Sequence, residues 1–254
     1  MFKTIEEYIL NIGNDLRECS LEDVDISRVD LRNVILPEDK NLFQKIKNKS
    51  LFKTMLPEKD YSKYNFNGVI LTGTIFTSKS IIPIDSDFFQ LINKKDLFET
   101  TLPDIQFSKY NFDDIKIAKT KFSKTSIFDA KYDFFQRINN KNIYRTVLPE
   151  ADYSLYDFND VHMIGCDFQE NSELPLVIDL FQKIYDKSLL DVKLPTSVLN
   201  RIFLYDLSEV EVDWQKYNLD IYTLIQLYEK YKQNKKMIFP EIDISLRIKK
   251  EISI

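Results

Sequence analysis

Large apolar side chains recur at every fifth position along most of this chain, and this period limits the fold more than any other feature of the sequence. An α-helix repeats about every 3.6 residues and a strand every 2.0, so neither element keeps such side chains on one face. The chain must therefore turn at regular intervals, and we expect these side chains to converge on a common axis. In the first complete run they are Ile46, Leu51, Leu56, Tyr61, Phe66, Leu71, Phe76 and Ile81.

The same period continues in two further runs, from Ile92 to Ile127 and from Ile138 to Phe168, and it decays towards Trp214. A second inward position is expected two residues before each large side chain, where the wall of a coil leaves less room. Small or β-branched residues occupy it, namely Cys19, Val24, Val29, Thr54, Val69, Thr74, Thr120, Thr125, Val161 and Cys166. The exceptions are three tyrosines, for which core stacking is favoured over a binding stripe: Tyr64, Tyr110 and Tyr156.

A longer repeat of 46 residues is superimposed on the period of five. The segment KSLFKTMLP ends at Pro57, and its counterparts end at Pro103 and Pro149. Because 46 is nine fives plus one, the register must break once in each unit. We place the break in PIDSDFFQLI, Pro83 to Ile92, as an acidic turn and a helical turn in which Asp87 caps Phe88 to Ile92. Equivalent corners are expected along one edge, at Pro37 to Ile46, Asp129 to Ile138 and Pro175 to Ile184.

The segment CSLEDVDISRVDLRNVIL, Cys19 to Leu36, carries the clearest form of the period. Its central residues are Leu21, Ile26, Leu31 and Leu36, and aspartates precede two of them. This pattern resembles the pentapeptide-repeat family over about 190 residues of the chain. The resemblance implies an all-β solenoid, a right-handed quadrilateral β-helix whose coils stack at the strand spacing of about 4.8 Å. To this we add short helical corners and helical caps.

We divide the chain into three parts. Residues 1–18 are predicted to form an N-terminal cap helix with apolar residues at helical spacing from Ile5 to Leu16, because an open coil exposes unpaired backbone. Residues 19–215 form the repeat, and Trp214 plugs its last coil. Residues 216–254 are predicted to form a C-terminal cap helix and a terminal strand, which pairs within the chain or across a homodimer.

The sequence contains none of the common catalytic motifs. It has no glycine-rich phosphate loop, no nucleophile motif and no zinc-ligand spacing. The one histidine, His162, is expected on the surface, and Cys19 and Cys166 are expected to be buried packing residues in a reducing compartment. We therefore expect no catalytic residue, no cofactor and no metal ion, and an enzyme assembled from scattered residues is the least favoured interpretation.

Five aspartates are the candidate contacts for a partner: Asp85, Asp87, Asp113, Asp114 and Asp129. Acids that recur at equivalent places in several units indicate turns and solvated faces rather than a catalytic pair, because an active site is normally built once. They are therefore assigned to binding and not to chemistry.

The favoured function is a non-enzymatic protein-binding solenoid, which acts as an inhibitor, effector or adaptor through its repeated surface. The alternative, implied by the resemblance, is a DNA mimic that binds DNA gyrase or another DNA-binding protein. The formal charge is −5 and 35 basic residues are mixed with 40 acids, so direct nucleic-acid binding is not expected. The opening MFKTIEEYIL is acidic and amphipathic, and no stretch reaches the roughly 20 apolar residues of a membrane span, which favours a cytoplasmic protein.

Overall fold

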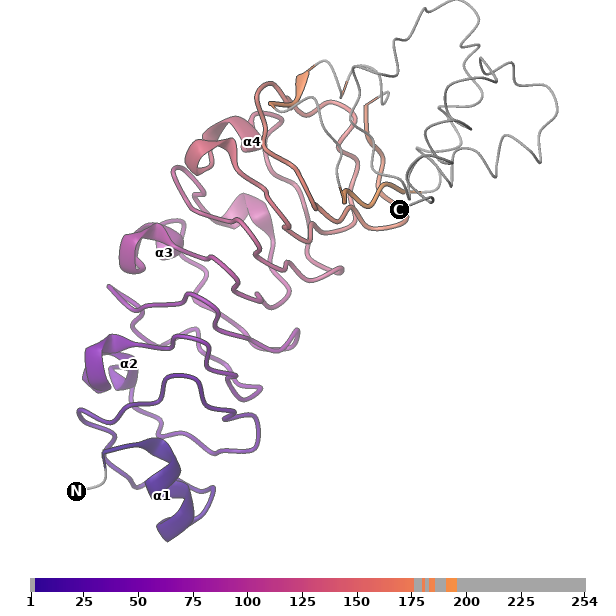
Figure 1. Cartoon of the computed structure of the whole chain (residues 1–254). Helices are drawn as coiled ribbons and strands as arrows, with labels where there is room; N and C mark the ends of the chain where they lie inside the picture. The colour runs from indigo at the N-terminus through magenta and orange to yellow at the C-terminus, as the bar shows by residue number, and fades with distance from the viewer. Residues whose placement is uncertain (1–2, 176–179, 181–182, 186–190, 196–254) are drawn as a thin grey trace, which may run out of the picture.

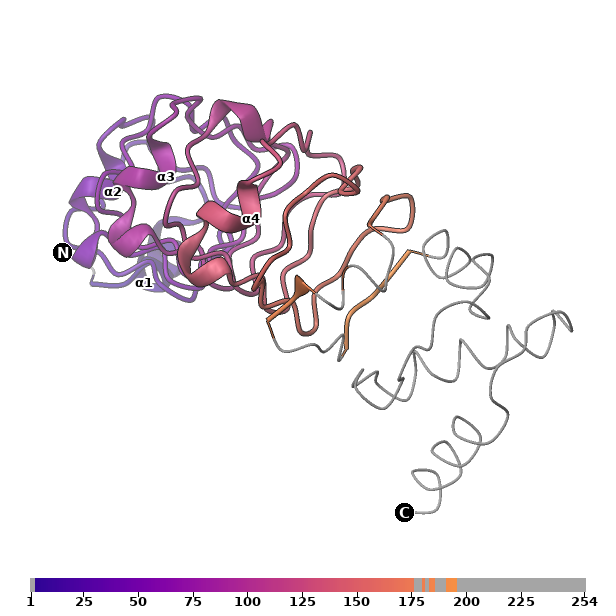
Figure 2. The same ribbon diagram turned by 90° about the horizontal axis from the view of Figure 1, so that it is seen from above.

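The computed structural model describes residues 3–175, 180, 183–185 and 191–195 of the chain. Over these residues the chain winds through successive coils that stack along one axis, and the N-terminal coil forms one end of the stack (Figures 1 and 2). Parallel bridges join residues that are 20 to 26 positions apart, so one coil takes about that many residues. None of the helices in this part of the chain is long and apolar enough to cross a membrane.

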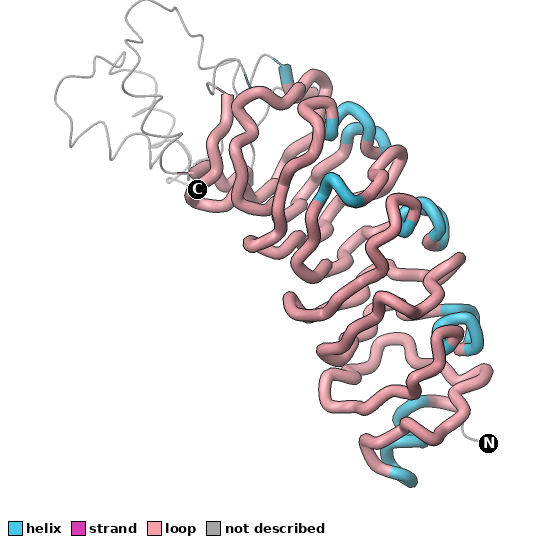
Figure 3. Tube along the Cα trace, turned by 180° about the vertical axis from the view of Figure 1, so that it is seen from behind, coloured by secondary structure: helices cyan, strands magenta, loops and turns pink. Residues whose placement is uncertain are grey.

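Short helices interrupt the coils. They are α1 (Ile5–Ile12), α2 (Leu42–Lys45), η1 (Lys47–Lys49), α3 (Phe88–Leu91), η2 (Asn93–Lys95), η3 (Phe107–Lys109), α4 (Phe134–Arg137) and η4 (Asn139–Lys141). The helices α2, α3 and α4 are 46 residues apart and lie along one edge of the stack (Figures 1 and 3).

The predicted all-β class is wrong. The described residues contain no β-strand and no sheet, so they form neither an all-β solenoid nor a right-handed quadrilateral β-helix (Figure 3). Isolated parallel bridges, each of one residue pair, take the place of strands. Strands do not form because the straight side between two corners of a coil is short. Residues with positive φ, such as Lys53, Gly73 and Glu99, recur at these corners. The turns around them leave room for a single bridged pair.

One column of these bridges runs through the described coils without interruption. Its members are Asp30, Met55, Ile75, Thr101, Lys121, Val147, Asp167 and Lys193. Their amides and carbonyls also form hydrogen bonds from coil to coil, for example from Met55 N to Val29 O at 2.9 Å. The column therefore satisfies backbone groups that would otherwise be unpaired between coils.

The five-residue period is confirmed as the period of the core. The large side chains expected inside are 0–5% exposed in all three runs, except Ile81 and Ile127, which are 50% and 58% exposed. The chain takes a step of six residues from Phe76 to the buried Ile82, and the same step leads from Phe122 to Phe128. The extra residue of each unit therefore lies at this step and not in the acidic turn. Thr125 is exposed for the same reason, and Ser126 is buried instead.

Buried threonines fill the second inward position on consecutive coils. Each donates from Oγ1 to a backbone carbonyl of the preceding coil at 2.7–2.8 Å, and they are Thr54, Thr74, Thr100, Thr120 and Thr146. Cys166 occupies the next place and is fully buried, which raises the pKa of its thiol well above the usual value. Cys19 is only partly buried, so the expectation of a buried cysteine is wrong there.

A glutamine on each corner helix fastens that helix to the next coil. Gln44, Gln90 and Gln136 each donate from Nε2 to two backbone carbonyls at 2.9–3.1 Å. Asp87 lies at the N-cap position of α3, but its side chain makes no capping hydrogen bond, so that prediction is wrong. Its φ of −93° and ψ of 3° are not the extended conformation from which an N-cap side chain reaches back to the helix.

The helix α1 packs on the first coil. Its N-cap Thr4 accepts a hydrogen bond from Glu7 N at 3.3 Å, and Ile5 and Tyr8 are buried. The helix ends at Ile12 and does not reach the expected Leu16. The next residue, Gly13, adopts a φ of 95°, which is outside the helical region. The predictions for Trp214 and for the C-terminal helix and strand in 216–254 lie outside the described residues.

Candidate functional site

At one corner of the third unit, several residues differ in chemical type from the residues at the equivalent positions of the earlier units. We call residues 127–132 and Leu155 the variant corner. At positions offset by 46 or 92 residues, Asp129 replaces Pro37 and Pro83, Lys131 replaces Asp39 and Asp85, Tyr132 replaces Lys40 and Ser86, and Leu155 replaces Lys63 and Lys109. The earlier units build the same turn without these side chains, so the fold does not require Lys131, Tyr132 or Leu155 here.

The carboxylate of Asp129 joins two coils. It accepts hydrogen bonds from Ser108 N at 2.7 Å, from Ser108 Oγ at 2.6 Å and from Gln106 Nε2 at 2.8 Å. In the other units the equivalent serine N–H is bound by an aspartate of its own turn. Asp60 accepts from Ser62 N at 2.8 Å, and Asp152 accepts from Ser154 N at 2.8 Å. In this unit Gln106 takes the place of that aspartate. The carboxylate comes instead from Asp129 on the next coil, at a position where the earlier units have proline.

These contacts favour the anionic form of Asp129. Partial burial alone would raise the pKa of its carboxyl, but the hydrogen bonds from Ser108 and Gln106 outweigh burial and lower it. Asp129 is therefore an anion at neutral pH.

Exposed apolar side chains surround this anion. Ile127 and Tyr132 are each 58% exposed, and Leu155 is 67% exposed. Phe128 lies beneath them with its ring centroid 4.8 Å from that of Tyr153 and 5.2 Å from that of Tyr156. The Tyr132 ring meets the edge of Tyr156 at a centroid distance of 5.4 Å. The variant corner therefore presents apolar groups on a packed aromatic base.

Two pockets open beside Asp129, Ala130 and Lys131, which line both. The first has a volume of about 250 Å³, with a floor of phenylalanines and a polar wall that includes Asp113 and Arg137. The second, of about 510 Å³, is lined by Phe128, Tyr132, Asp152, Leu155 and Tyr156.

Tyr110 lines the first pocket and differs from its counterparts in the other units. The hydroxyl of Tyr64 donates to Pro37 O at 2.8 Å, and that of Tyr156 donates to Ala130 O at 2.7 Å. The hydroxyl of Tyr110 has no hydrogen-bond partner within the described residues. Burial raises the pKa of Tyr110 to about 12, so it offers this pocket a neutral hydroxyl.

The structure brings together two of the five predicted contact residues. Asp113 lines the first pocket with Asp129, and its Oδ1 lies 2.6 Å from Arg137 Nε. Asp114 sits in the adjacent turn at a φ of 60° and accepts from Asn139 Nδ2 at 2.5 Å. Asp85 and Asp87 are exposed at the corresponding corner of the preceding unit, where Asp85 Oδ1 accepts from Asp87 N at 3.0 Å and neither residue lines a described pocket.

Sequence reasoning missed Lys131, Tyr132 and Leu155. The signal that could have found them is the comparison of equivalent positions in the 46-residue units, where each changes class. Repetition argues against a catalytic role for the acids, and the positions where repetition fails mark the variant corner.

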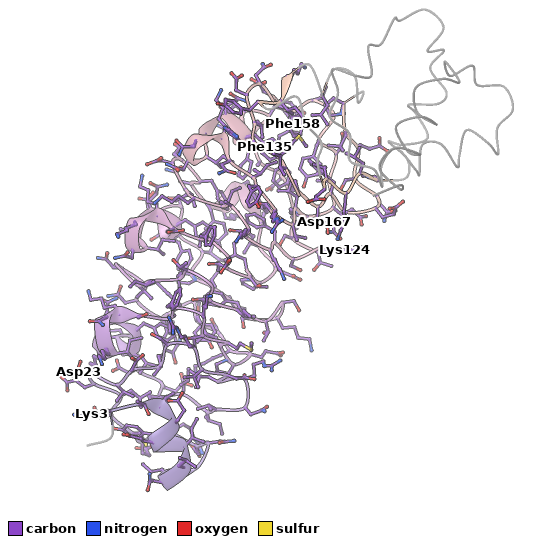
Figure 4. The ribbon with its side chains drawn as sticks, viewed as in Figure 1. Lys3, Asp23, Lys124, Phe135, Phe158 and Asp167 are labelled. Carbon is purple, nitrogen blue, oxygen red and sulfur yellow. The ribbon has the colours of Figure 1, made fainter. Side chains whose placement is uncertain are left out.

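The described coils have a packed interior, and charged side chains lie on the edge opposite the corner helices. Phe135 of α4 and Phe158 lie inside the stack (Figure 4), and their ring centroids are 4.8 Å apart. Lys124 and Asp167 lie on the edge opposite the helices (Figure 4). His162 is partly buried, with its ring 3.9 Å from that of Tyr185. Within the described ranges, no group of three or more His, Cys, Asp or Glu residues is arranged to hold a metal ion.

Comparison with protein-family models gave no match for this chain, and a search of curated proteins likewise gave no match.

Proposed function

We propose that this chain is a non-enzymatic protein-binding module of the pentapeptide-repeat type, which acts in the cytoplasm as an adaptor, inhibitor or effector and docks its partner on the variant corner. The observation that carries the proposal is the exposure of Tyr132 and Leu155, each more than half accessible, where the earlier units have Ser86 and Lys109. Large apolar side chains that folding does not need are typical of binding anchors.

The composition of the corner supports docking by a protein. Covering a side chain such as Leu155 contributes about 1.5–3 kcal/mol. Charged Asp129 and Lys131 flank the apolar groups and supply the polar rim of a typical interface. The coil backbone holds the corner in place, so binding needs little ordering of the chain.

The charges of the helix edge do not favour the DNA-mimic alternative. Asp113 pairs with Arg137 at 2.6 Å, and Asp39 pairs with Lys45 at 2.6 Å. A duplex mimic needs a dense stripe of unpaired negative charge, because DNA carries one charge about every 1.7 Å.

The test restores the sequence of the earlier units. Tyr132→Ser combined with Leu155→Lys introduces residues that already occupy the same turns, so the variant is expected to fold with an unchanged circular dichroism spectrum. A photocrosslinking residue placed at Ile127 in the full chain should trap a protein that the double variant no longer traps. Reconstitution with that protein should give a Kd at least tenfold weaker for the variant, about 1.4 kcal/mol.

The matched control is Lys63→Ser, which alters an exposed side chain at the equivalent place in the first unit. It should bind as the wild type does. Equal binding by the wild type and the double variant would refute the variant corner as the docking site.

A further inference from the structure

A second charged surface lies half a coil away from the variant corner. It consists of Arg28, Lys53, Glu99, Lys119 and Arg145, which we call the basic ridge, and Lys119 precedes Asp129 by ten residues in coils of at least 20. The backbone N–H of each ridge residue donates to a carbonyl of the next coil, at 2.8, 3.1, 3.4, 2.7 and 2.9 Å in chain order. The ridge is therefore one continuous corner of the stack.

Aromatic rings lie under the basic side chains of the ridge. Arg28 Cζ is 5.2 Å from the centroid of Phe52, and Lys53 Nζ is 5.4 Å from the same centroid. Lys119 Nζ is 4.8 Å from the ring of Phe98, and Arg145 Cζ is 5.2 Å from that of Tyr144. Cation–π attraction at this range holds the cationic groups in defined positions on the surface.

Two glycines leave room for these side chains. A Cβ at Gly73 would come within 2.7 Å of Lys53 Cγ, and a Cβ at Gly165 would come within 2.6 Å of Arg145 Cγ. Both glycines also have positive φ, of 71° and 68°. Glycine therefore stands on the coil that follows Lys53 and on the coil that follows Arg145.

The four basic residues of the ridge occupy positions with a left-handed backbone conformation. Arg28, Lys53, Lys119 and Arg145 have φ between 50° and 65°, a region that glycine and asparagine adopt more readily. Four bases face one acid, Glu99, in a chain whose formal charge is −5. Glu99 lies 3.9 Å from Lys53 and 3.0 Å from Lys119, while Arg28 and Arg145 have no acidic partner among the described residues.

We propose that the basic ridge binds an acidic, extended segment of a second protein. Charge complementarity selects an anionic segment, and the occupied ring faces select a peptide over single-stranded nucleic acid, whose bases need free aromatic faces to stack. Gly73 occupies this corner on the coil between Lys53 and Glu99. Five coil steps therefore separate Arg28 from Arg145, or about 24 Å at the usual strand spacing. An extended peptide covers that distance with seven or eight residues at about 3.3 Å each.

The ridge and the variant corner are separate surfaces, so one occupant does not block the other. A chain with both would bring two proteins together, which is the behaviour of an adaptor.

The test is fluorescence anisotropy of labelled octaglutamate with the full chain. Binding should weaken at least tenfold between 50 and 500 mM NaCl, and Lys119→Asn with Arg145→Asn should weaken it at least fivefold. Asparagine tolerates positive φ, so the substitutions suit the backbone. Glu99→Asn removes the competing carboxylate and should strengthen binding at least threefold. Tetraglutamate should bind more weakly, because it spans half of the ridge.

The control Lys109→Asn changes an exposed lysine away from the ridge and should leave the Kd unaltered. The variant with Tyr132→Ser and Leu155→Lys should still bind octaglutamate, so a failure of this proposal is distinct from a failure of the variant corner. Octaglutamate binding that ignores the ridge substitutions would overturn the proposal. Tighter, ridge-dependent binding of an eight-nucleotide oligothymidine would replace the peptide with single-stranded nucleic acid.

Discussion

Threonine at the second inward position is a structural residue because its hydroxyl has a fixed acceptor. Thr120 is fully buried, and its Oγ1 donates to Leu97 O at 2.7 Å. Valine has nearly the same shape but no hydroxyl, so Thr120→Val removes this hydrogen bond and leaves Leu97 O with the single bond from Thr100 N at 2.9 Å. We expect a loss of about 0.5–1.5 kcal/mol in the free energy of unfolding, measured by urea denaturation.

The control for this change is Thr101→Val, on the preceding coil, where Thr101 forms a bridge with Lys121 next to Thr120. Thr101 is partly exposed and makes no side-chain hydrogen bond within the described part. It should alter stability by less than about 0.5 kcal/mol. Equal effects of the two substitutions would contradict the role assigned to the threonine column.

Asp129 makes the free energy of unfolding depend on pH in the acidic range. Its pKa is lowered in the folded protein, so the unfolded chain binds the proton more tightly. The stabilisation is therefore complete above the unfolded pKa of about 3.9 and is lost as the pH falls through the lower folded value. Urea denaturation at pH 6 and pH 3 should show a smaller acid-induced loss for Asp129→Asn than for the wild type. Asp87→Asn, whose carboxylate makes no hydrogen bond in the described region, should retain the wild-type loss.

At the scale of elements, the corner helices are held by their glutamines rather than by caps. Gln90 Nε2 donates to Asn111 O at 3.1 Å and to Asp113 O at 2.9 Å. Gln90→Ala removes both bonds, and we expect a loss of about 1–2 kcal/mol in the free energy of unfolding. Leu91→Ala on the same helix changes a side chain that is 47% exposed and should have a smaller effect. A Gln90→Ala variant as stable as the wild type would show that the helix is held by its phenylalanines alone.

The core could be predicted from the sequence because burial follows a period that survives in every unit. The six-residue step could not be placed, because Ile81 and Ile82 are both isoleucine and either could face inward. The absence of strands could not be foreseen either, since it depends on turns with positive φ at lysine, glutamate and arginine positions.

The candidate site was predicted only in part. Asp113 and Asp129 are two of the five predicted partner contacts, and both line the first pocket. Tyr132 and Leu155 carry no chemical motif, and their significance lies in the contrast with Ser86 and Lys109. That contrast is visible in the sequence, but only the coordinates bring the two side chains to one pocket.

At the scale of the whole molecule, the unit of construction is 46 residues, which is two coils. Deleting residues 93–138 joins Ile92 to Asn139, and Asn139 occupies the place of Asn93 in the next unit. We expect the shortened chain to fold cooperatively, as measured by circular dichroism during heating, and to lose binding at the variant corner.

The control deletion removes residues 93–136, two fewer, and shifts every later side chain out of its inward position. It should unfold or aggregate. Similar melting of both deletions would contradict the idea that coils join only in register.

The single-pair bridges have a consequence for solubility. A strand at the margin of a sheet offers a row of unpaired amides and carbonyls that recruits other chains. Here each described coil is tied to its neighbours by isolated pairs, and positive-φ turns interrupt the backbone between them. The flank of the described stack therefore gives a foreign strand no row of unpaired groups to extend, so it does not promote aggregation by strand addition.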